Sequence, residues 1–189
     1  MKHTILALLM AVGLAPVAQA EELTGDVKLA CEAILCLSTG SRPSECSPSI
    51  KKYFSYTNVK FYKVLDWRKG FLGLCPASSD PGMPELVNAI ANGAGRCDAA
   101  ELNRLNRKTI TYQVWRRHKD MGDGYVSRSL VTYGNNVPSY CAAYSGHEWT
   151  DGVLKAKYQG NLWPYPDGYK FPRKGAASIP KNDGRWVDN

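Results

Sequence analysis

A few carboxylates in this sequence could act as the acid and base of a hydrolase. A glycosidase needs two carboxylates across the sugar, one of them with a raised pKa. The candidates are Glu32, Glu45, Asp66 and Glu101. Glu32 directly follows Cys31, and a position beside a disulfide could bury its carboxylate. None of the four lies in a motif that creates a cleft, so a small lysozyme-like hydrolase acting on peptidoglycan is an alternative hypothesis.

Histidines and glycines offer little further chemistry. His118 lies in the basic run 116–119, which is typical of a solvated strand end, and His147 precedes Glu148 without the second histidine of the zinc-binding H-E-x-x-H motif. The chain has no G-x-S-x-G nucleophile motif. Gly93 and Gly95 follow a predicted helix, which is the wrong context for a phosphate loop. The sequence therefore predicts no catalytic, cofactor-binding or metal-binding residue, no cofactor, and no enzyme.

The cysteines are the clearest functional-group signal. An even number of cysteines in an exported chain indicates a set of disulfides. A zinc site would need cysteine pairs two to four residues apart with histidines nearby, and such pairs are absent. The six residues predicted to form disulfides are Cys31, Cys36, Cys46, Cys75, Cys97 and Cys141.

The pairing of these six cysteines is only partly constrained, because they allow fifteen combinations. On one helix, Cys31 and Cys36 would be separated by about 7.5 Å of rise, which exceeds the usual Cα separation of a disulfide. They should therefore bond to different partners. Cys36 with Cys46 is the natural local pair, and Cys31–Cys75 with Cys97–Cys141 would complete one plausible set. Other sets stay open.

The first twenty residues predict a cleavable export signal. Lys2 precedes an apolar run over 5–14, and Ala18-Gln19-Ala20 has the small-x-small pattern of a signal peptidase site. The run is too short to span a bilayer, which takes about 20 apolar residues. We expect a periplasmic protein that does not span the membrane once residues 1–20 are removed.

The net charge of +7, from 24 basic and 17 acidic residues, would suit contact with anionic surfaces. A solvated basic surface explains the charge equally well. Two basic clusters with neighbouring aromatics, Tyr112 and Trp115, would allow stacking on nucleic acid. An exported protein rarely meets DNA except during conjugation, so nucleic acid is not the expected partner. The two clusters are Arg104, Arg107 and Lys108, then Arg116, Arg117 and Lys119.

Hydrophobic periodicity and cap residues predict an α+β protein. Its N-terminal half should be helical and disulfide-bonded, with helices over about 24–40, 47–54, 59–72, 84–95 and 98–105. Alternating patterns over 110–114 and 125–133 predict a small antiparallel β region, joined by a turn at 121–124. We expect an irregular segment over 138–144, a short strand over 153–158, and an extended, partly ordered tail rich in proline and aromatics. The predicted divisions are 1–20, 21–151 and 152–189.

Several segments resemble one known family. They are 29–40 (LACEAILCLSTG), 43–46 (PSEC), 48–54 (PSIKKYF), 71–76 (FLGLCP), 138–141 (PSYC) and 146–151 (GHEWTD). The chain resembles the TrbM/KikA/MpfK conjugal transfer proteins over about 27–151, and from Gly152 onward the resemblance ends.

The resemblance implies a periplasmic accessory protein of a plasmid conjugation system, with a type IV secretion apparatus for mating-pair formation. It implies partners among the envelope proteins of that system and structural disulfides, and it carries over no catalytic residue. His147 and Glu148 match the last segment, and the resemblance gives them no role. A KikA-like toxin or host-range factor is a further alternative.

Overall fold

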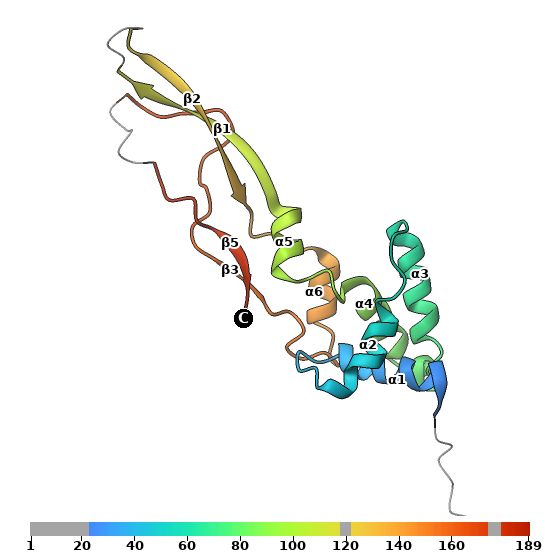
Figure 1. Cartoon of the computed structure of the whole chain (residues 1–189). Helices are drawn as coiled ribbons and strands as arrows, with labels where there is room; N and C mark the ends of the chain where they lie inside the picture. Colours follow the sequence, from blue (N-terminus) through green and yellow to red (C-terminus); the bar gives the residue numbers. More distant parts are fainter. Residues whose placement is uncertain (1–22, 118–121, 174–178) are drawn as a thin grey trace, which may run out of the picture.

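A computed structural model describes residues 23–117, 122–173 and 179–189. The predicted export signal, His118 and the start of the expected turn at 121–124 lie outside the described residues. The described chain forms a group of helices from which a long β-hairpin projects, so that the molecule is elongated (Figure 1). The prediction of an α+β fold with a helical N-terminal half is confirmed.

The helical body consists of the helices α1 to α6 with two short 3₁₀ helices. Their bounds are α1 Gly25–Leu37, η1 Ser44–Cys46, α2 Ser47–Tyr53, α3 Phe61–Leu72, η2 Pro76–Ser79, α4 Met83–Gly93, α5 Ala99–Asn106 and α6 Ser139–Ser145. The five helices expected before residue 107 are confirmed to within a few residues at each end.

Local sequence explains where several of these helices begin. Pro48 and Pro84 lie in the first turns of α2 and α4, where the missing N–H of proline leaves no hydrogen bond unmade. Asp98 caps α5, because its Oδ1 accepts a hydrogen bond from the N–H of Glu101 at 2.8 Å. The reciprocal half of a capping box is absent, since the Glu101 carboxylate binds Arg104 instead.

The prediction of an irregular segment over 138–144 is wrong, because the structure has helix α6 there. The segment has too few residues for a clear helical period, and helices this short are marginal on their own. Tertiary contacts explain its formation. Cys141 and Tyr144, three residues apart on one face, are both buried, and α6 packs against α4.

Three disulfides hold the helical body together. Cys31–Cys75 joins α1 to the residue before η2, Cys36–Cys46 joins α1 to η1, and Cys97–Cys141 joins the α4–α5 connection to α6. These are the pairs of the set that the sequence put forward. Cys97 precedes the projecting hairpin and Cys141 follows it, so the third disulfide closes the base of that hairpin.

A buried arginine fixes the position of α4. Arg68 is 7% exposed, and its guanidinium donates through Nη1 to the carbonyls of Ala91 and Ala94, at 3.3 and 3.1 Å. It also lies over the rings of Tyr53 and Phe54, 4.7 and 5.1 Å from their centroids. A cation at a helix C-terminus interacts favourably with the helix dipole, so Arg68 binds α3 to the end of α4.

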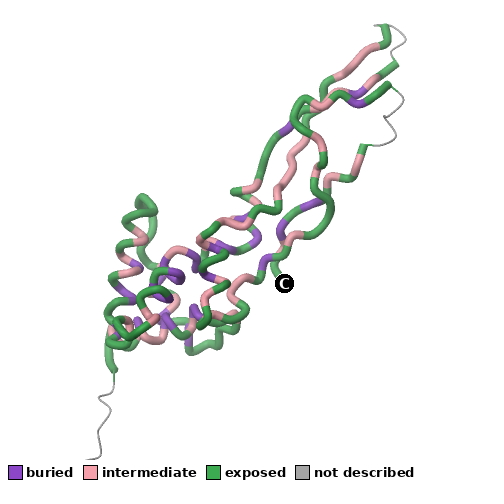
Figure 2. The backbone as a smooth tube through the Cα atoms, turned by 180° about the vertical axis from the view of Figure 1, so that it is seen from behind, coloured by how far each residue is buried: buried purple, intermediate pink, exposed green. Residues whose placement is uncertain are grey.

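The projecting part of the chain is built on two long antiparallel strands, β1 (Arg107–Arg116) and β2 (Gly124–Tyr133). The short strand β4 (Tyr169–Lys170) pairs with β1 in parallel, a pairing the sequence did not predict. We call β1 and β2, the described residues of the turn between them (117, 122 and 123), and residues 161–173 the arm. Buried residues concentrate in the helical body, whereas the arm is mainly exposed or half-buried (Figure 2).

The segment after residue 151 is extended, as expected, and it folds back over the rest of the chain. Its strand β3 (Ala156–Gln159) begins three residues later than predicted and pairs with β5 (Arg185–Asp188) in antiparallel fashion. Phe171 and Trp186 are 1% and 6% exposed. The aromatic side chains of this segment therefore pack against the arm and the helical body. The division at residue 151 stays a prediction.

Candidate functional site

The four candidate carboxylates of a hydrolase are scattered over the helical body. Glu32, Glu45, Asp66 and Glu101 lie on α1, η1, α3 and α5. Glu32 is only half-buried, and its carboxylate lies 4.0 Å from the ammonium of Lys28, one turn earlier on the same helix. The structure therefore does not bring the predicted carboxylates together as a pair on one element.

Glu101 has an environment opposite to that of a catalytic acid. Arg104 donates two hydrogen bonds to its carboxylate, at 2.6 and 2.7 Å. These bonds hold the pKa of Glu101 below its usual value, whereas a general acid of a glycosidase needs a raised pKa. Glu101 is a surface partner of Arg104 on α5.

His147 has a local structural role in the loop after α6. Its Nδ1 accepts a hydrogen bond from the backbone N–H of Trp149 at 3.2 Å, and the two rings meet edge to face. Glu148 is exposed. Within the described part of the chain, no three side chains among histidine, cysteine, aspartate and glutamate gather as metal ligands could.

The two basic clusters predicted from the sequence do not form one surface. Arg104 lies on α5 and pairs with Glu101, while Arg107 and Lys108 begin β1 and Arg116 ends it. The ten residues of β1 span about 30 Å, so the two clusters lie at opposite ends of the arm. Lys119 lies outside the described residues.

The arm is nevertheless basic along its whole length. Its described residues include seven cationic side chains and two anionic ones, Asp123 and Asp167. Asp123 already lies within 4.0 Å of Arg117 and Arg173. The cationic side chains are Arg107, Lys108, Arg116, Arg117, Arg128, Lys170 and Arg173. This surface would attract an acidic partner.

The aromatic rings that suggested base stacking, Tyr112 and Trp115, pack against other rings within the arm. The ring of Tyr112 packs against Trp163 and Phe171, with centroids 5.4 and 5.8 Å apart. Trp115 packs against Tyr125 and carries the guanidinium of Arg173 at 4.6 Å. These rings pack against one another and against neighbouring side chains of the arm.

Sequence reasoning missed how much of the arm comes from the tail. Trp163, Tyr165, Tyr169 and Phe171 pack against one another beside β1. Asp167 fixes this segment, because its carboxylate accepts hydrogen bonds from the N–H and the hydroxyl of Thr111. The aromatic residues of this segment could have indicated that it packs against the rest of the chain, but the sequence did not show which strand these rings would cover.

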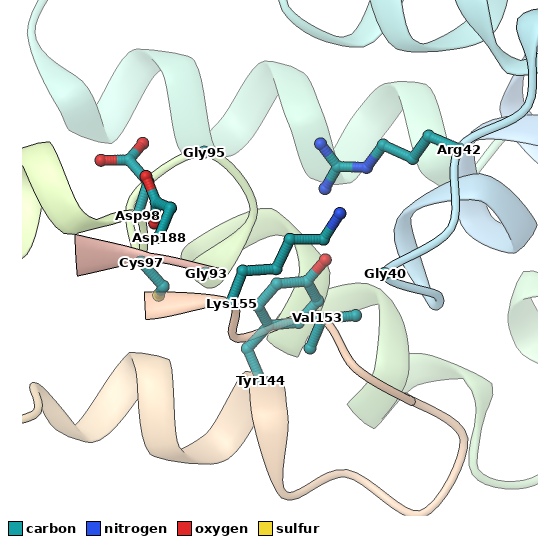
Figure 3. A pocket seen from close by; sticks show the side chains of 10 residues that line it. All are labelled: Gly40, Arg42, Gly93, Gly95, Cys97, Asp98, Tyr144, Val153, Lys155 and Asp188. Atoms are coloured by element: carbon teal, nitrogen blue, oxygen red, sulfur yellow. The ribbon is translucent and has the colours of Figure 1, made fainter. Parts of the chain in front are cut away.

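A second feature is a pocket of about 270 Å³ between the loop after α1, the α4–α5 connection and the segment before β3. Arg42 and Lys155 extend into it from two sides, near the hydroxyl of Tyr144 (Figure 3). Asp98 and Asp188 lie at its other end. Neither Arg42 nor Lys155 was singled out by the sequence, since they belong to loops more than a hundred residues apart.

Tyr144 gives this region a measurable pH dependence. Burial raises the pKa of Tyr144 to about 12, and the nearby guanidinium of Arg42 opposes that shift. A tyrosine of the unfolded chain titrates near pH ~10. Because the folded pKa is the higher one, the neutral hydroxyl stabilises the fold fully below pH ~10, and this contribution is lost as the pH rises towards about 12.

We expect Tyr144 to lower the free energy of unfolding by about 1.4 kcal/mol per pH unit over that range. Urea unfolding at a series of alkaline pH values measures this slope. Tyr144→Phe should reduce the slope without abolishing it, because burial also raises the pKa of Tyr53. The exposed Tyr62 provides the control Tyr62→Phe, which should keep the wild-type slope. Equal slopes for all three proteins would contradict the prediction.

Comparison with known proteins shows the family of the chain. The model of the TrbM family matches residues 22–174, which include α1 to α6, the arm and β3. The match continues past residue 151, where the resemblance read from the sequence ended. No curated protein and no solved structure gives a significant match. Since the family model spans well over half of the sequence, the chain belongs to the TrbM family, which associates it with conjugation.

Proposed function

We propose that the protein is a non-enzymatic accessory of a plasmid conjugation system, exported to the periplasm and acting there through contacts with envelope proteins of the type IV secretion apparatus. Membership of the TrbM family supports the link to conjugation. The three disulfides support an oxidising compartment, since such bonds persist outside the reducing cytoplasm. The predicted signal over 1–20 supports export. No helix in the described part of the chain is long and apolar enough to cross a membrane.

The observation that carries the proposal is the basic arm. It projects from the disulfide-bonded body (Figure 1). Its framework of rings is packed, and its cationic side chains are mostly without acidic partners among the described residues. Such a surface suits recognition by charge, which steers encounter with an acidic partner and fixes its orientation. We assign to the arm the contact with the secretion apparatus.

Charge reversal on the arm tests this assignment. The triple variant Lys108→Glu, Arg116→Glu, Arg128→Glu changes exposed side chains of β1 and β2. We expect it to weaken binding to the secretion apparatus by at least about tenfold, a loss of about 1.4 kcal/mol of binding free energy, and thereby to lower mating frequency. Complementation of a deletion strain, followed by counting transconjugants, is the measurement.

A matched control separates the arm from net charge. The variant Lys51→Glu, Lys60→Glu, Lys63→Glu makes the same change in charge on exposed residues of α2, of the position before α3 and of α3. It should complement the deletion like the wild type. If both variants mate normally, or if the deletion itself leaves mating unchanged, the proposed function is contradicted.

The proposed role needs no catalysis. Purified, disulfide-bonded protein should leave a suspension of cell walls turbid. Clearing of the suspension that Glu32→Gln abolishes would replace the proposal with the hydrolase hypothesis. The scattered positions of the candidate carboxylates favour the first result.

A further inference from the structure

The pocket beside Tyr144 is formed by two close backbone approaches. Gly40 donates its N–H to the carbonyl of Asp151 at 2.7 Å, and a Cβ at Gly40 would lie only 2.1 Å from the carbonyl oxygen of Gly152. On the opposite wall, a Cβ at Gly93 would lie 2.4 Å from the Cβ of Tyr144. Only glycine permits both approaches, and together they bring the loop of Arg42 opposite the segment of Lys155.

One end of the pocket is cationic and lacks an acidic partner. The guanidinium of Arg42 and the ammonium of Lys155 point towards the same space, beside the hydroxyl of Tyr144 (Figure 3). That hydroxyl donates its proton to the carbonyl of Leu37, so it can accept a hydrogen bond from Arg42. Among the described residues, no carboxylate lies within 4.0 Å of either cation.

The other end of the pocket is acidic, and its carboxylates are fixed by α5. Asp98 Oδ1 accepts from the N–H of Glu101 at 2.8 Å, and Asp188 Oδ1 accepts from the N–H of Ala99 at 2.9 Å. These two bonds hold both carboxylates at the start of α5 and leave the second oxygen of each available. The pocket therefore has opposite charges at its two ends (Figure 3).

This distribution of charge selects among anions. A phosphate or a longer polyanion would gain from Arg42 and Lys155 but would be repelled by the two carboxylates. A peptide that ends in a free carboxylate fits both ends, since its last carboxylate meets the cations while its N–H or ammonium groups meet the aspartates. The volume of about 270 Å³ is near the lower limit of small-ligand sites, so it suits the end of a chain.

We propose that this pocket binds the C-terminal carboxylate of a peptide, with Arg42 and Lys155 holding the carboxylate and Tyr144 positioning Arg42. The site lies between the helical body and the segment after residue 151 and is separate from the arm, so the inference goes beyond the proposed function and does not rest on it. Peptide binding by purified protein can be measured whether or not the arm contacts the secretion apparatus.

Three probes on the wild-type, disulfide-bonded protein test the inference: tri-alanine with a free carboxylate, tri-alanine with a C-terminal amide, and inorganic phosphate. Backbone amide NMR signals of Gly95 and Lys155 report on the pocket. We expect the free acid to shift these signals in a saturable manner, and the amide to bind at least about tenfold more weakly, as the loss of a charge-assisted hydrogen bond requires.

Variants provide the second measurement. Arg42→Gln with Lys155→Gln should abolish the shifts caused by the free acid, while Lys60→Gln with Lys63→Gln, which removes the same charge at the start of α3, should leave them unchanged. Equal binding of acid and amide overturns the proposal. Tighter binding of phosphate than of the free acid, or no saturable shift with any probe, overturns it as well.

Discussion

The double variant Cys97→Ala, Cys141→Ala is expected to lose about 4 kcal/mol of unfolding free energy, as the loop-entropy estimate gives for a disulfide with a sequence separation of 44. The enclosed loop contains α5 and the whole β1–β2 hairpin. Without the disulfide, the unfolded chain gains freedom over that entire loop. Urea unfolding of the oxidised protein, with its two other disulfides intact, measures the loss.

The Cys36–Cys46 disulfide offers an internal comparison. Its sequence separation is 10, so its removal by Cys36→Ala with Cys46→Ala should cost less, about 3 kcal/mol on the same estimate. Removal of Cys97–Cys141 should also expose the arm to proteolysis at its base, whereas removal of Cys36–Cys46 should not. A larger loss for Cys36–Cys46 than for Cys97–Cys141 would show that loop length does not govern these bonds.

Trp186→Ala is expected to cost about 3–5 kcal/mol, the range measured for large-to-small substitutions of buried aromatic residues. Trp186 is 6% exposed, its ring meets Tyr158 edge to face, and its indole N–H donates to the carbonyl of Gly134 at 3.0 Å. The side chain of Asn103 bonds both the N–H and the carbonyl of Trp186. Loss of the Trp186 side chain should free β5 and the end of the chain from α5 and from the base of β2.

Thermal unfolding and limited proteolysis measure this effect together. The variant should lose its C-terminal segment to protease before the helical body is cut. Trp149→Ala is the matched control, because Trp149 is 44% exposed and its loss should cost no more than about 1 kcal/mol. Equal stability of the two variants would mean that the segment after residue 151 does not stabilise the fold.

Local signals account for the parts of the fold that the sequence predicted well. Proline in the first turns of α2 and α4, and the Asp98 cap of α5, are short-range features that fix where a helix begins. The rise of a helix separated the partners of Cys31 and Cys36, and the length of the turn favoured the local pair Cys36–Cys46. The pairs Cys31–Cys75 and Cys97–Cys141 were one of several sets that the sequence left open.

Long-range contacts account for what the sequence did not show. Helix α6 forms because Cys141 bonds Cys97, and residues 161–173 become part of the arm because their rings pack on Tyr112. The pocket depends on the approach of Gly40 to Gly152, which no local pattern indicates. The acidic residues with the most suggestive neighbours in sequence, such as Glu32, were brought to no common site.

Crosslinking from the arm in living cells shows whether the arm contacts the secretion apparatus. A benzophenone amino acid at Ser127, an exposed position of β2, would be activated by light in cells that carry the plasmid and in cells that lack its transfer genes. We predict a crosslinked product with an envelope protein of the secretion apparatus only when the transfer genes are present, and none from the same group placed at Lys63 on α3. If position 127 gave no product, or the same products with and without the transfer genes, the arm would not be the part of the protein that contacts the secretion apparatus.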